Sequence, residues 1–109
     1  MQELEKVVEQ YSEELRNKGL RATVIEDKTG KRGYKLSIRG DMKTEHWEIR
    51  WRGDSQYDPD KEIWKSINER WKLYKKGKLV KDVTATNPGD LLRYIIDNLS
   101  PTARHTVLF

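Results

Sequence analysis

The strictest alternation of apolar and polar residues in the chain lies at residues 45–52. Trp47, Ile49 and Trp51 alternate there with charged or imidazole side chains. A period of two produces two distinct faces only in a β-strand, so the pattern predicts a strand whose apolar residues enter a core. The opposite face would carry the polar set, which consists of His46, Glu48, Arg50 and Arg52.

Two earlier stretches, 20–26 and 34–38, also place apolar residues at alternate positions. Glycine-containing segments at 27–33 and 40–43 follow these predicted strands and favour turns. Residues 79–85 predict a short fourth strand. The residues expected to face the core are Leu20, Ala22, Val24, Tyr34, Leu36, Ile38, Trp47, Ile49 and Trp51.

Helical spacing of apolar residues predicts a first helix over 3–18, which ends at Gly19 because glycine suits the left-handed closing position. Asp58 and Pro59 are typical of a helix start, since Asp caps free N–H groups and Pro suits the first turn. An apolar stripe follows these two residues at helical spacing. The pattern therefore predicts a second helix over 58–75.

Asn87 and Pro88 repeat the start signal and predict a last helix over 91–99. Beyond it, the apolar end at 106–109 is expected to add an edge strand or to cover the core.

In chain order these elements give α-β-β-β-α-(β)-α. Strands joined by short turns pair antiparallel, and helices cover their apolar face. The 109 residues are therefore predicted to form a single α+β domain over 1–109. This domain would have two layers, with a three- to four-stranded antiparallel sheet and its helices packed on one face. A four-residue turn at 40–43 would set Lys35 opposite Glu48 and Ser37 opposite His46.

Composition narrows the functional classes. The chain contains no cysteine, so neither a disulfide framework nor a thiolate metal site is expected. No apolar run approaches the roughly 20 residues that span a bilayer, and the acidic, amphipathic N-terminus differs from a signal peptide. No catalytic or cofactor motif stands out, so we expect a cytoplasmic protein that is not an enzyme and holds no cofactor or metal.

Positive charge gathers on the predicted outward face of the sheet. The net charge is +4, and residues 21–52 carry nine basic against five acidic side chains. In the predicted register Lys35 pairs with Glu48, whereas four arginines have no acidic partner: Arg21, Arg39, Arg50 and Arg52. A lysine cluster follows at Lys72, Lys75, Lys76 and Lys78. Because the planar guanidinium binds two phosphate oxygens at once, these eight residues predict a nucleic-acid-binding surface, with DNA favoured over RNA.

The same charges would also suit a sheet face that binds nothing, because a solvated face uses charge for solubility and to block edge pairing. The predicted function is a small, non-catalytic nucleic-acid-binding protein. The alternative is a protein-interaction module, such as a small inhibitor or accessory factor that binds an acidic partner surface. A homodimer is a further alternative, because an exposed strand edge beside an apolar C-terminus favours pairing.

The order helix-strand-strand-strand-helix resembles the core of the restriction-endonuclease-like nucleases. That family carries a Glu on the first helix, an Asp near the second strand and Glu-x-Lys on the third. Glu48-Ile49-Arg50 is similar to the last motif, with Arg in place of Lys. Glu9 or Glu13 would stand for the first, whereas Asp41 falls after the second strand. The resemblance implies a degenerate metal-dependent nuclease as a third alternative. The order also resembles the double-stranded-RNA-binding domain, whose lysine-rich second helix this chain lacks.

Overall fold

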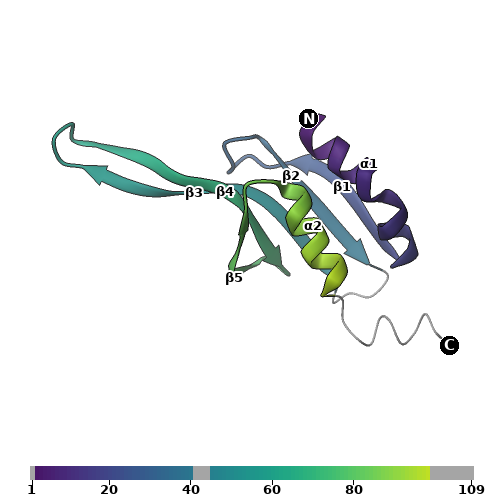
Figure 1. Cartoon of the computed structure of the whole chain (residues 1–109). Helices are drawn as coiled ribbons and strands as arrows, with labels where there is room; N and C mark the ends of the chain where they lie inside the picture. The colour runs from purple at the N-terminus through teal and green to yellow at the C-terminus, as the bar shows by residue number, and fades with distance from the viewer. Residues whose placement is uncertain (1, 41–44, 99–109) are drawn as a thin grey trace.

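The computed structural model of the chain describes residues 2–40 and 45–98. Its elements in chain order are α1 (Gln2–Asn17), β1 (Leu20–Glu26), β2 (Tyr34–Gly40), β3 (His46–Asp58), β4 (Ile63–Lys75), β5 (Lys78–Ala85) and α2 (Pro88–Asp97). The five strands form one antiparallel sheet in the order β1-β2-β3-β4-β5, so each strand pairs with its neighbours in sequence (Figure 1). The predicted α+β class is confirmed, whereas the prediction of three to four strands and three helices is wrong.

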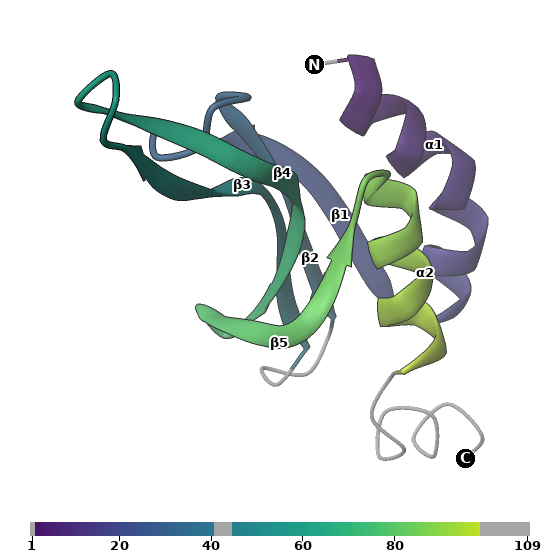
Figure 2. The same ribbon diagram turned by 60° about the vertical axis from the view of Figure 1, so that its left-hand side comes forward.

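Both helices lie on the same side of the sheet, which bends so that β5 comes alongside α2 (Figure 2). The core forms between these layers because the helices and strands each present an apolar face to it. Of the predicted core positions, Tyr34 is exposed, and Ala22, Val24 and Trp51 are only partly buried. The largest fully buried side chains are Trp71, Leu4, Leu36, Ile38, Ile49, Leu73, Leu92 and Ile95.

The helix predicted over 58–75 is absent, because this segment forms β4 and the turn before it. Asp58 does cap free N–H groups, as expected, but in a hairpin turn and not at a helix start. Its Oδ1 accepts hydrogen bonds from the backbone N–H groups of Asp60 and Lys61, at 3.1 and 3.4 Å. Glu62 then takes a positive φ of 53°, which turns the chain back instead of starting a helix. Pairing with β3 therefore replaced the helical hydrogen bonds that the apolar spacing predicted.

The hairpin of β3 and β4 extends far beyond the rest of the sheet (Figure 1). A β-bulge between Arg52 and Asp54 separates its inner part from the projecting part. Gly53 is required there, since a Cβ at this position would lie 2.8 Å from the side chain of Glu69. We call residues 54–67, which form the projecting part, the arm.

The predicted register between the second and third strands is wrong by two residues. Lys35 lies opposite Arg50, Ser37 opposite Glu48 and Arg39 opposite His46. The predicted last helix is present as α2 and begins earlier, because Asn87 caps it through a hydrogen bond from the Gly89 N–H at 2.8 Å. The prediction for 106–109 lies outside the described residues.

Candidate functional site

The sheet face that points away from the helices is called the outer face. Alternation along the paired strands places ten side chains of β1, β2 and β3 on it, together with three from β4. From β1 to β4 these residues are Arg21, Thr23, Ile25, Lys35, Ser37, Arg39, His46, Glu48, Arg50, Arg52, Arg70, Lys72 and Tyr74.

Glu48 occupies the centre of the outer face and binds two of its cations. Its carboxylate lies 2.8 Å from Lys35 Nζ and also accepts a hydrogen bond from Arg50, whose guanidinium stacks over the ring of Tyr74 at 4.3 Å. Burial opposes the ionised form of Glu48, but the hydrogen bonds and charges of Lys35 and Arg50 outweigh it and hold its pKa below the ordinary value. The expectation that Arg50 has no acidic partner is therefore wrong, and Lys35 reaches Glu48 diagonally.

Arg52 is engaged by the turn between β1 and β2. Its Nη1 donates to Asp27 Oδ2 at 3.1 Å, and its Nη2 donates to Thr29 Oγ1 at 3.0 Å. Asp27 is 5% exposed. Burial raises the pKa of Asp27, but the Thr29 hydrogen bonds and the Arg52 charge lower it by more, so the pKa falls below its usual range. Arg52 thus holds a turn against β3, and the expectation that it has no acidic partner is also wrong.

The lowered pKa of Asp27 predicts an acid-dependent loss of stability. Its contribution is complete above the ordinary pKa of 3.8 and disappears as the pH falls through the lower folded-state value. We expect Asp27→Asn to be less stable than the parent protein at pH 7. The two urea-unfolding curves should converge as the pH falls below 3.8. An unchanged difference between the two proteins from neutral to strongly acidic pH would contradict this assignment.

Arg21 and Arg39 remain available at the edge of the outer face. They lie directly opposite each other on β1 and β2, and both are exposed. The structure shows no ion pair for either residue within the described part of the chain. Like charges placed opposite each other destabilise a sheet unless an anion lies between them.

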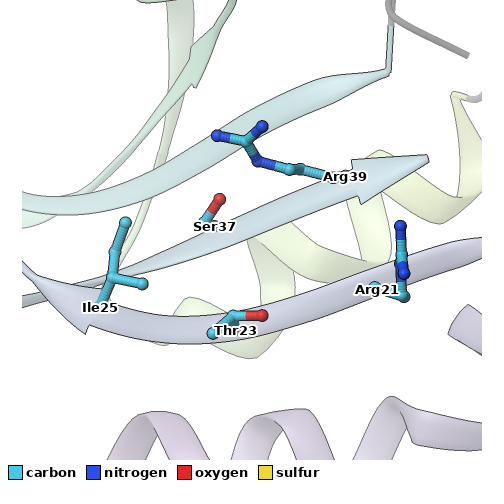
Figure 3. Close-up of a pocket in the computed structure, with 5 residues that line it drawn as sticks. All are labelled: Arg21, Thr23, Ile25, Ser37 and Arg39. Atoms are coloured by element: carbon cyan, nitrogen blue, oxygen red, sulfur yellow. The ribbon is translucent and has the colours of Figure 1, made fainter. Parts of the chain in front are cut away.

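These two arginines border a hollow of about 330 Å³ (Figure 3). The hydroxyl groups of Thr23 and Ser37 and the apolar side chain of Ile25 complete its lining. Hydroxyl donors beside two guanidinium groups suit a phosphate or carboxylate oxygen.

A basic row continues from this hollow across the end of the sheet. Arg39 lies opposite His46, and the Lys76 N–H donates to the His46 carbonyl at 3.0 Å. Neighbouring strands are about 4.8 Å apart, so Arg21, Arg39, His46 and Lys76 mark successive positions along roughly 14 Å. Among the predicted site residues, the fold thus brings Arg21, Arg39 and Lys76 to one end of the sheet.

The other predicted lysines do not lie together on one surface. Lys72 lies on the outer face with its Nζ 3.6 Å from Asp54, a weak ion pair with an exposed carboxylate. Lys75 lies opposite Trp47, and its Nζ is 4.5 Å from the ring centroid, so it belongs to the core side of the sheet. Lys78 is exposed at the start of β5. The lysine cluster therefore divides between the two faces and a turn.

Sequence reasoning missed two parts of the candidate surface. The hydroxyl groups of Thr23 and Ser37 were given no role in binding, although they alternate with Arg21 and Arg39 along the sequence. The helix prediction also concealed Tyr57 and Trp64 of the arm, which lie directly opposite each other across the hairpin.

The geometry does not favour the nuclease alternative. Glu9 and Glu13 are exposed on α1, on the helix side of the sheet, whereas Glu48 lies on the outer face. Across residues 2–40 and 45–98, no cluster of three or more acids or histidines could hold a metal ion. Asp41 lies outside the described residues.

Within the described segments, neither helix is long and apolar enough to cross a membrane. Comparison with known proteins gives no match: no family model matches the chain, and neither the curated proteins nor the solved structures contain a significantly similar one.

Proposed function

We propose that this protein binds nucleic acid without catalysis, through the row that Arg21, Arg39 and Lys76 form across the end of the sheet. The supporting observation is the opposed pair of Arg21 and Arg39, which are exposed and unpaired within the described chain, beside two hydroxyl groups. Arg50 and Arg52 of β3 are held by Glu48 and Asp27, so they do not define the site. Guanidinium groups at strand spacing suit successive backbone phosphates, and such contacts bind many sequences alike. DNA remains favoured over RNA as the proposed partner.

The test is charge reversal at Arg21 and Arg39, followed by fluorescence anisotropy with a labelled random-sequence DNA duplex. Two lost phosphate contacts should weaken binding at least about tenfold at low salt. The slope of log affinity against log salt should become shallower by about two. Single-stranded DNA and RNA of equal length show which nucleic acid is preferred.

A matched control makes the same change in net charge at positions outside the basic row. Lys6→Glu with Lys81→Glu alters the net charge equally at two exposed positions, on α1 and β5. If this control weakens binding as much as the Arg21 and Arg39 variant, the row is not the site. Salt-independent affinity of the parent protein would contradict phosphate binding altogether.

A further inference from the structure

The arm carries the most exposed aromatic surface of the described chain. Trp64 is 70% exposed and Tyr57 46% exposed, and the two rings contact each other across the ribbon with centroids 5.3 Å apart and planes tilted by 59°. Ile63, beside them at the turn, is 50% exposed. Large aromatic side chains that stay exposed beside a turn are typical of binding hot spots rather than of a folded core.

Within the described part of the chain, the arm contributes no residue to the hydrophobic core. Among the described residues, its strands pair only with each other, from Asp54 opposite Ile67 to Asp58 opposite Ile63, and twelve of its fourteen residues are exposed. A two-stranded ribbon of this kind is marginally stable by itself in water. The arm therefore exposes apolar surface without adding to the core, which indicates that something else covers it.

The charge of the arm indicates which kind of surface covers it. The arm contains four carboxylates and two lysines, whereas the whole chain has a net charge of +4. One of its lysines, Lys65, pairs with Asp58 at 3.3 Å. The turn carboxylates Asp60 and Glu62 are exposed and show no ion pair within the described chain. The arm thus offers two free acids beside an indole ring.

The hollow on the outer face offers the complementary set. It has two guanidinium groups that show no ion pair with any described residue, and the apolar side chain of Ile25, within a volume of about 330 Å³. That volume lies within the range of about 300–1,000 Å³ that is usual for ligand pockets. Guanidinium groups also stack favourably on the face of an indole. The indole ring and the two acids of the arm therefore complement the apolar side chain and the two guanidinium groups of the hollow.

The two surfaces lie too far apart to meet within one molecule. Arg39 lies opposite His46, where β3 begins, whereas the arm starts at Asp54, farther along the same strand. Eight residues of strand span roughly 26 Å, and the arm continues away from the sheet (Figure 1). A contact between them must join two copies of the chain.

We propose that the arm of one copy docks into the hollow of a second copy. Trp64 would enter between Arg21 and Arg39, and Asp60 and Glu62 would pair with the two guanidinium groups. Such a contact joins two different surfaces, so it forms rings or open chains of subunits unless two copies exchange arms reciprocally. The inference goes beyond nucleic-acid binding and uses the same arginines, so nucleic acid should compete with self-association.

The test is the molar mass of the pure protein, measured by light scattering and sedimentation over a wide range of protein concentration at low salt. The parent protein should self-associate, and its mass should fall on addition of either salt or a short DNA duplex. Trp64→Ala should remain monomeric while its DNA affinity stays unchanged, because Trp64 lies outside the basic row. This variant separates the two proposals, since Arg21 and Arg39 serve both.

A more specific experiment reverses the charges of the hollow in one variant and those of the arm in another. Arg21→Glu with Arg39→Glu should be monomeric, and so should Asp60→Lys with Glu62→Lys. A mixture of these two proteins should associate again, because the reversed acids and bases can pair. The Lys6→Glu and Lys81→Glu control should associate like the parent protein.

Three results would overturn the proposal. The parent protein could stay monomeric at every concentration, which would leave a different partner for the arm. Association that depends on Trp64 but survives reversal of Arg21 and Arg39 would show that arms bind one another. Failure of the mixed charge-reversed proteins to associate, with both folded by circular dichroism, would exclude the arm-to-hollow contact.

Discussion

Trp71→Ala is expected to lower the free energy of unfolding by about 3–5 kcal/mol, the range found when large aromatic side chains are removed from cores. Trp71 is fully buried, and its ring packs edge-on against Trp51 at 5.3 Å. Domains of this size are stable by only about 5–15 kcal/mol, so the variant should lose much of its folded population under mild denaturant. Urea unfolding followed by far-ultraviolet circular dichroism measures the change without depending on tryptophan fluorescence.

Two controls separate cavity formation from a general effect of losing tryptophan. Trp71→Phe keeps an aromatic ring and removes an indole N–H that is buried without a hydrogen-bond partner in the described structure, so it should cost much less. Trp64→Ala makes the same substitution on the exposed arm and should leave the urea midpoint almost unchanged. Equal losses from Trp71→Ala and Trp64→Ala would contradict this description of the core.

Glu48→Gln is expected to change stability and nucleic-acid binding in opposite directions. The free energy of unfolding should fall by about 1–3 kcal/mol, because Lys35 and Arg50 lose their charged acceptor on a largely buried carboxylate. The same loss releases two cations on the outer face. Affinity for DNA at low salt should therefore rise, and the salt dependence should become steeper by as much as two.

The two readouts are urea unfolding and anisotropy titration, each compared with Glu13→Gln. That control removes the same charge from an exposed position on α1. It should leave stability nearly unchanged and raise DNA affinity only slightly. If Glu48→Gln weakens DNA binding while the protein remains folded, then Glu48 does not mask these cations and the proposed role of the outer face is wrong.

The ion pair of Lys35 and Glu48 shows how a correct contact followed from an incorrect register. The residues were expected to face each other directly, yet Lys35 lies opposite Arg50 and reaches Glu48 across a diagonal. Long side chains tolerate a shift of two residues because such a shift keeps every side chain on its face. The residues of β2 and β3 were therefore assigned to the correct faces of the sheet, although every predicted pair between the two strands was wrong.

The availability of Arg52 depended on a residue that is distant in sequence. Asp27 comes from a turn 25 residues before Arg52, and no local pattern indicated that it would bind this guanidinium. Arg50, by contrast, forms an ion pair with Glu48 of the same strand. Only Arg21 and Arg39 kept the unpaired state that was expected of all four, within the described chain.

The sequence alone was sufficient for the α+β class, for the first helix, for the strands at 20–26, 34–38 and 45–52, and for their outward face. Those features depend on local periodicity and on turn chemistry, which nearby residues determine. Tertiary structure decided the state of 63–75, because apolar residues four apart suit a helix as well as a strand that pairs with β3. It also decided which cations stay free and where the acidic, aromatic arm projects, because both depend on contacts between segments that the sequence does not place together.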